Sequence, residues 1–299
     1  MKEKVKCKKC GLLIDDDMQY CPYCGYVQDQ NENQNEEKEN KDEPSIQTSI
    51  NTNLPKERGN NVFAFESKVL DLPLWKKIAS FLLGYIGLQI IVQILKLFIS
   101  TETELYFIIS GSYSGAVNFG VYIILFGLFI ILFNDDLFKI LKEFKNSDTW
   151  ISGLAYGFLV LIISSAINAM LNLIPHSGVN NNESSIDSIT TIFPLLSLLV
   201  FGLIGPICEE FTYRVGFFGF FRKINPILGY IFTAILFGFI HFDFQSNDLI
   251  NELINIPSYI IAGLMLCYIY DYKGIGTSII AHALNNVTGI LLQIILYSM

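Results

Sequence analysis

Three charged side chains lie in the middle of a long apolar segment of this sequence. They are Glu209, Glu210 and Arg214, within the stretch PICEEFTYR. Ionisable groups inside a membrane are expensive and by default functional. At helical spacing Glu210 and Arg214 are one turn apart and can pair, whereas Glu209 is rotated by about 100°. We therefore expect Glu209 to have a separate role, the alternative being that all three charges lie at a helix end in water.

Two of the three histidines, His241 and His282, also lie in apolar segments, and Asn286 follows His282 by one helical turn. A carboxylate and an imidazole around one water form a general-base pair. Imidazole and amide N–H groups are the donors required where an oxyanion develops. With a rise of about 1.5 Å per residue, Glu209 and His241 are about equally far from the turn at 223–226, and His282 is somewhat shallower. If these helices converge, the residues predict hydrolytic chemistry.

Other catalytic signatures are missing from the sequence. It contains no G-x-S-x-G motif and no H-E-x-x-H motif, so neither a serine hydrolase of that type nor a zincin is indicated. A metal-dependent protease that uses His241 and His282 as ligands remains a weaker alternative.

Four cysteines near the N-terminus form two C-x-x-C-G motifs: Cys7 with Cys10, and Cys21 with Cys24. Each motif can wrap two thiolates around one tetrahedral ion, and four thiolates close the coordination shell. We predict a structural zinc site; disulfides are the alternative, which a reducing compartment disfavours. Residues 1–27 resemble small bacterial zinc ribbons, which need the ion to fold. This module is expected either to dock a cytosolic protein partner or to have no partner; it is too poor in basic residues for nucleic acid.

The composition indicates a polytopic membrane protein. The 299 residues are 52% hydrophobic and 14% aromatic, which is too apolar for an ordinary soluble protein. The net charge is −8, and residues 29–43, with seven acids and two lysines, account for five of these charges. Residues 28–66 have almost no apolar side chains and are expected to form a flexible acidic tether. No signal peptide precedes them, so the N-terminus is expected in the cytosol.

Apolar runs of spanning length predict an all-α fold of about seven transmembrane helices. They lie at 78–95, 112–133, 150–174, 189–208, 224–240, 253–270 and 274–298. Lysine and arginine occur only in alternate connecting loops, which places the protein in the cell membrane with its N-terminus inside and its C-terminus outside. Residues 137–144 are amphipathic and predict an interfacial helix or a simple connector. We divide this part into N-terminal helices at 67–149 and a catalytic core at 150–299.

Three motifs in register resemble the CPBP family of membrane proteins, which includes CAAX prenyl endopeptidases and bacteriocin-processing or self-immunity proteins. The motifs are Glu209-Glu210-x-x-x-Arg214, Phe237-x-x-x-His241 and His282-x-x-x-Asn286. The resemblance implies that Glu209 activates water with His241, that His282 and Asn286 stabilise the oxyanion, and that Glu210 and Arg214 hold the shape of the site. It also implies that Phe237 packs the imidazole of His241. This chain departs from the family in having Val215 between the arginine and Gly216.

These observations predict a glutamate-type membrane endopeptidase that acts on a membrane-associated peptide or protein tail and needs no catalytic metal. The alternative from another class is a membrane adaptor or bacteriocin self-immunity protein that uses the same polar cluster to bind a partner.

Overall fold

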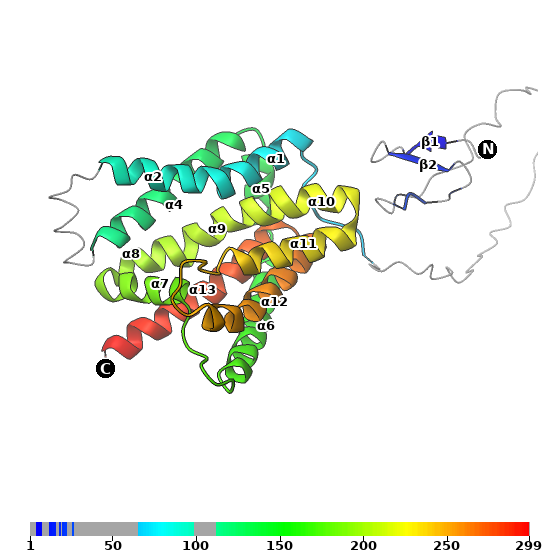
Figure 1. Cartoon of the computed structure of the whole chain (residues 1–299). Helices are drawn as coiled ribbons and strands as arrows, with labels where there is room; N and C mark the ends of the chain where they lie inside the picture. Colours follow the sequence, from blue (N-terminus) through cyan, green and yellow to red (C-terminus); the bar gives the residue numbers. More distant parts are fainter. Residues whose placement is uncertain are drawn as a thin grey trace, which may run out of the picture. The chain divides into compact units, whose positions relative to one another are not determined.

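The computed structural model describes residues 4–7, 12–15, 18, 20–22, 26, 65–98 and 112–298. The chain divides into two compact units, Met1–Glu66 and Ser67–Met299. Almost all of the predicted tether lies outside the described residues. In the first unit, strand β1 (Lys4–Lys6) pairs antiparallel with β2 (Leu13–Asp15), and Val5 lies opposite Ile14 (Figure 1).

The described part of the second unit is helical, which confirms the predicted fold class. Its α-helices are α1 (Leu74–Leu82), α2 (Leu88–Phe98), α4 (Ser112–Leu132), α5 (Leu137–Glu143), α6 (Ser147–Leu171), α7 (Asn181–Ile192), α8 (Pro194–Leu199), α9 (Gly205–Glu209), α10 (Gly219–Ile224), α11 (Pro226–Phe239), α12 (Leu249–Lys273) and α13 (Ile275–Ser298). The π-helical segments η2 (Leu83–Gly87), η3 (Val200–Ile204) and η4 (Glu210–Phe218) continue the helices on either side of them.

Six helices of the described residues are long and apolar enough to cross a membrane. The predicted fifth span corresponds to α11, which has 14 residues. A helix of that length covers about 21 Å, less than the hydrocarbon core of about 30 Å. The predicted fourth span, 189–208, belongs to a helix that extends further than expected and runs from Pro194 to Ile224 without a break. This helix contains Glu209, Glu210 and Arg214. The number seven is therefore approximate.

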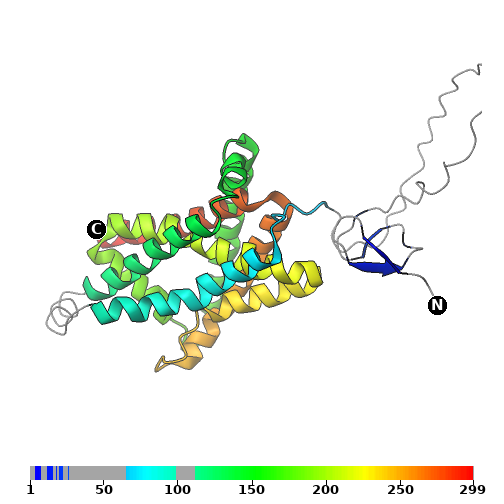
Figure 2. The same ribbon diagram turned by 90° about the horizontal axis from the view of Figure 1, so that it is seen from above.

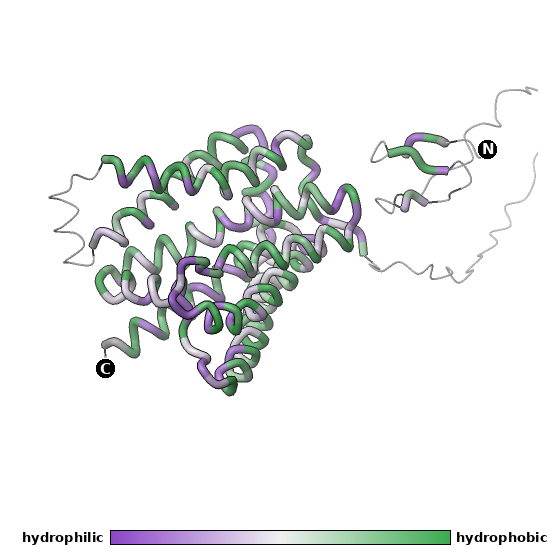
Figure 3. The backbone as a smooth tube through the Cα atoms, viewed as in Figure 1, coloured by the Kyte–Doolittle hydropathy of each residue, from purple (hydrophilic) through white to green (hydrophobic). Residues whose placement is uncertain are grey.

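The helices pack into one bundle in which the long helix from α8 to α10 lies beside α1 and α4 (Figure 1). Seen from above, α4 and the α1–α2 helix run along this long helix, while α6 is viewed nearly end-on (Figure 2). Apolar residues recur along all of the long helices (Figure 3), and many large apolar side chains are exposed, as expected for a protein surrounded by lipid. Two charged residues of the long helix, Glu210 and Arg214, are completely buried inside the bundle.

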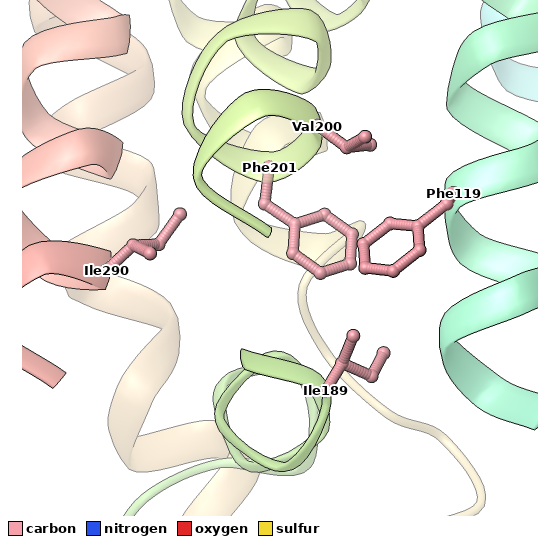
Figure 4. Packing of buried hydrophobic residues seen from close by; sticks show 5 residues of the cluster. All are labelled: Phe119, Ile189, Val200, Phe201 and Ile290. Carbon is pink, nitrogen blue, oxygen red and sulfur yellow. The ribbon is translucent and has the colours of Figure 1, made fainter. Parts of the chain in front are cut away.

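A buried apolar cluster holds the long helix against α4, α7 and α13. Phe201 of η3 lies with its ring 5.3 Å from that of Phe119 of α4, and Ile189 and Ile290 approach from α7 and α13 (Figure 4). Val200 of η3 completes the cluster. These contacts fix the segment that immediately precedes the charged motif.

The charged motif itself has π-helical winding. π-helical turns are rare and occur frequently at functional sites. Side chains support the widened turns here: Ser80 donates to the carbonyl of Phe211 at 2.8 Å, and Thr212 donates to that of Cys208 at 2.7 Å. The winding of η4 is thus tied to α1, which precedes it by more than a hundred residues.

Gly84 of η2 lies directly against Thr212 of η4. A Cβ atom there would lie 1.7 Å from Oγ1 of Thr212, so Gly84→Ala must displace η4. We expect the unfolding temperature of this variant to fall, with a loss of about 1–3 kcal/mol. The matched control is Gly127→Ala in α4, whose new methyl group would meet nothing within 4 Å. Equal unfolding temperatures for the two variants would contradict this close contact.

The predicted first span begins at residue 78, which leaves Lys76 and Lys77 in the preceding loop, but both lie inside α1. Lys76 and Lys77 are buried because both have partners. Nζ of Lys76 lies 2.6 Å from a carboxylate oxygen of Asp136, and Lys77 donates to the carbonyl of Gly219 at 3.1 Å. Burial of an ammonium group requires such partners, and no spacing in the sequence indicates them.

Candidate active site

Glu210 is completely buried and connects the long helix to α13. Its carboxylate lies 3.2 Å from Nη1 of Arg214 and 2.9 Å from Nδ1 of His282, and it accepts a hydrogen bond from Ser278 at 2.6 Å. Arg214 is also completely buried. A buried carboxylate needs such partners for each lone pair. Glu210 therefore holds the imidazole of His282 by a direct contact with its Nδ1.

Glu209 points to a different part of the same site. Its side chain is 18% exposed, whereas that of Glu210 is 0% exposed. One carboxylate oxygen lies 3.7 Å from Nε2 of His282, and the other accepts a long hydrogen bond of 3.5 Å from the hydroxyl of Tyr122. His282 thus lies between two carboxylates, and only that of Glu209 is accessible.

His241 follows the end of α11 and is oriented by two contacts. Its Nδ1 lies 2.8 Å from the carbonyl oxygen of Phe237, and its ring stacks on Tyr259 at 4.2 Å with an angle of 8°. Because a carbonyl only accepts, Nδ1 carries the hydrogen, and Nε2 of the neutral ring is an acceptor. Glu209 and His282 both interact electrostatically with this imidazole.

Phe237 contacts both imidazoles and so shows how close they are. Its ring centroid lies 5.0 Å from that of His241 and 6.0 Å from that of His282. The two imidazoles are therefore at most about 11 Å apart. The guanidinium of Arg214 lies 4.3 Å from the same ring, a favourable cation–π arrangement.

Asn286 lies one turn after His282 on α13. Its amide nitrogen donates to the carbonyl of Phe201 at 3.2 Å, and its oxygen accepts from Asn285 at 3.4 Å. These contacts orient the amide. An amide nitrogen has two hydrogens, so that of Asn286 can make one more hydrogen bond.

A polar network holds the loop that follows His241. Glu252 is buried and accepts from the backbone nitrogens of Asn181 at 2.8 Å and Asp243 at 3.1 Å. The side-chain amide of Asn181 also donates to Asp243 at 2.8 Å. This hydrogen bond, with one from the backbone of Gln245, lowers the pKa of Asp243. The loop is thus anchored at Asp243 through both its backbone nitrogen and its carboxylate.

Three residues of the site were missed in the sequence: Tyr122, Tyr259 and Ser278. A signal existed only for Ser278, which precedes His282 by one turn and so shares its helical face. Tyr122 and Tyr259 belong to α4 and α12, and no motif or spacing links them to the charged residues.

In the first unit, Cys7 and Cys21 are buried in one cluster with Ile14. The backbone nitrogen of each cysteine donates to the carbonyl five residues later, Leu12 at 2.9 Å and Tyr26 at 2.7 Å. Two equivalent turns that bring their first thiols together fit a tetrahedral zinc ion. The other two predicted ligands, Cys10 and Cys24, lie outside the described residues.

Apolar spanning helices around a cluster of acids and imidazoles define a multi-pass membrane protein with a polar site inside its helical core. Residues 191–288 match the family described as Type II CAAX prenyl endopeptidase Rce1-like, and residues 3–28 match the zinc-ribbon domain. These two matches confirm the resemblance seen in the sequence, and the first supports a membrane endopeptidase. No curated protein and no solved structure matches the chain significantly.

Proposed function

We propose that this protein is a glutamate-type membrane endopeptidase that hydrolyses a peptide bond in a membrane-associated peptide or protein tail. The observation that carries the proposal is the position of His282, with Nδ1 held by buried Glu210 and Nε2 facing accessible Glu209. The Rce1-like domain spans both residues.

In the proposed mechanism, Glu209 takes a proton from a water that attacks the scissile carbonyl carbon. The neutral His241 can hold this water through Nε2, because its Nδ1 is engaged with a backbone carbonyl. The C–N bond then breaks, and Glu209 returns the proton to the leaving amine. No metal takes part in these steps.

The oxyanion that forms during attack requires nearby donors. In its imidazolium form, His282 can donate through Nε2 while Nδ1 remains bonded to Glu210. The free amide hydrogen of Asn286, one turn away, is the second donor. Such donors are each worth about 10²–10³ in rate.

The proposal is tested by comparing peptides in membrane fractions from cells with the wild-type protein and with Glu209→Gln. A protease predicts that one or a few substrates accumulate uncleaved in the variant. Asp71→Asn is the control, because this fully exposed acid lies outside the site. Unchanged peptides together with an unchanged phenotype would instead favour an adaptor or self-immunity protein. Loss of cleavage on chelation in a variant lacking residues 1–27 would favour the metal-dependent alternative.

We further propose that the N-terminus is cytoplasmic and the C-terminus outside. The zinc ribbon would then present a surface to a cytosolic protein, with zinc held by Cys7, Cys10, Cys21 and Cys24. The zinc site in this proposal is supported by the equivalent backbone hydrogen bonds at Cys7 and Cys21.

Tyr259 provides a sharp test of the position of His241. Tyr259→Leu removes the stacked ring and frees the imidazole, so we expect kcat to fall by about 10-fold or more, as small displacements of catalytic groups do. Tyr259→Phe keeps the ring and loses the hydrogen bonds that the hydroxyl makes with Asn180, so its kcat should stay within about threefold of the wild type. Equal losses in the two variants, measured with the cleaved peptide, would contradict a stacking role.

A further inference from the structure

A separate cavity of about 560 Å³ lies away from the candidate active site. Its walls come from the segment before α1, from α5, from the start of α6 and from the end of α12. Four lysines line it, and we call it the lysine pocket after Lys68, Lys139, Lys142 and Lys273. The proposed hydrolysis uses none of these residues.

The pocket has more positive than negative charge. Its two acids, Glu143 and Asp148, both have partners: Glu143 accepts from the backbone nitrogen of Gly276 at 2.7 Å, and Asp148 lies 3.4 Å from Lys273. Burial also raises the pKa of Glu143, which disfavours its charged form. Two acids therefore do not balance the four lysines.

Two of these lysines have no carboxylate of the described residues within ion-pair distance. They are Lys68 and Lys142, and both are exposed. Lys68 is nevertheless held in place, because its backbone nitrogen donates to the carbonyl of buried Asp271 at 2.7 Å. Lys139 lies 3.7 Å from Asp136 and is only weakly engaged. Ammonium groups gathered in this way favour an anion.

The surroundings of the pocket indicate what kind of anion it binds. On α5, Ile140 packs inward, whereas Phe138 is 75% and Leu141 57% exposed beside the lysines. Trp150 follows the lining residue Thr149 and is also exposed. A small anion would leave Phe138, Leu141 and Trp150 exposed to water, whereas the acyl chains of a lipid would cover them.

We propose that the lysine pocket binds the phosphate group of an anionic phospholipid, with Lys68 and Lys142 at the phosphate and Phe138 and Leu141 against the acyl chains. Basic pockets at the ends of transmembrane helices bind anionic headgroups in this way. The site would select a lipid at the edge of the bundle.

The test uses the full-length protein in vesicles and the fluorescence of Trp150, with Trp75→Phe removing the other tryptophan. Lipids with brominated acyl chains quench tryptophan, so quenching by phosphatidylglycerol relative to phosphatidylcholine measures the preference. The pocket variant carries Lys68→Gln and Lys142→Gln. The control carries Lys145→Gln and Lys223→Gln, which remove the same charge from lysines that do not line the pocket.

We expect the preference of the pocket variant for phosphatidylglycerol to fall by at least about fivefold. A single lysine near a membrane surface contributes roughly that much to the binding of anionic lipid. The control should keep most of the preference, and both variants should unfold at the wild-type temperature in phosphatidylcholine. Equal losses in the two variants would overturn the proposal in favour of diffuse surface charge. Displacement of phosphatidylglycerol by millimolar inorganic phosphate would overturn it in favour of a free-phosphate site.

Discussion

Glu209→Gln is expected to reduce kcat by about 10³-fold while leaving the fold intact. Glutamine keeps the shape of the side chain and its contact with Tyr122, but it cannot accept a proton from water, and general-base catalysis contributes about 10²–10⁴. The carboxylate is partly exposed and has no buried ion pair with Arg214, so its neutralisation should not destabilise the helix. The measurement is single-turnover cleavage of the peptide identified in membrane fractions, with the protein reconstituted in vesicles.

Asp71→Asn serves as the control, with expected wild-type kcat, because its side chain is fully exposed and outside the site. His241→Ala added to Glu209→Gln should lower the rate by much less than the product of the two single effects, because groups that act on one water fail together. A Glu209→Gln protein that keeps more than a tenth of the wild-type rate would remove this carboxylate from the proposed mechanism.

Arg214→Met is expected to be the most destabilising substitution in the site, by about 3–5 kcal/mol. It leaves the carboxylate of Glu210 buried without its cation and removes the guanidinium from the ring of Phe237. The imidazole of His282 would lose its fixed partner as a result, so activity should fall as well. The free energy of unfolding in mixed micelles measures the effect.

A double-mutant cycle separates this ion pair from simple loss of packing. Glu210→Gln together with Arg214→Met should be more stable than Arg214→Met alone, because the unpaired buried charge is then absent. If the two single effects simply add, Glu210 and Arg214 do not stabilise one another, and Glu210 is held by Ser278 and His282 only.

The membrane fold and the pairing of Glu210 with Arg214 were predictable from local information. Long apolar runs specify spanning helices whatever their neighbours are. Charges at i and i+4 share a helical face, so the pairing of Glu210 with Arg214 followed from spacing alone. Span boundaries were less predictable. The helix continues past the charges to Ile224 because Ser80 and Thr212 support its wide turns, and α11 is shorter than its apolar run.

By itself, the sequence determined the helical membrane architecture, the cysteine pairs and the charged motif, because each depends on residues close together in the chain. Only the tertiary structure decided that His282 lies between Glu209 and Glu210, and that Tyr122 and Tyr259 complete the site. These contacts join helices far apart in the chain. Their side chains meet through packing of whole helices, and no local periodicity records that packing.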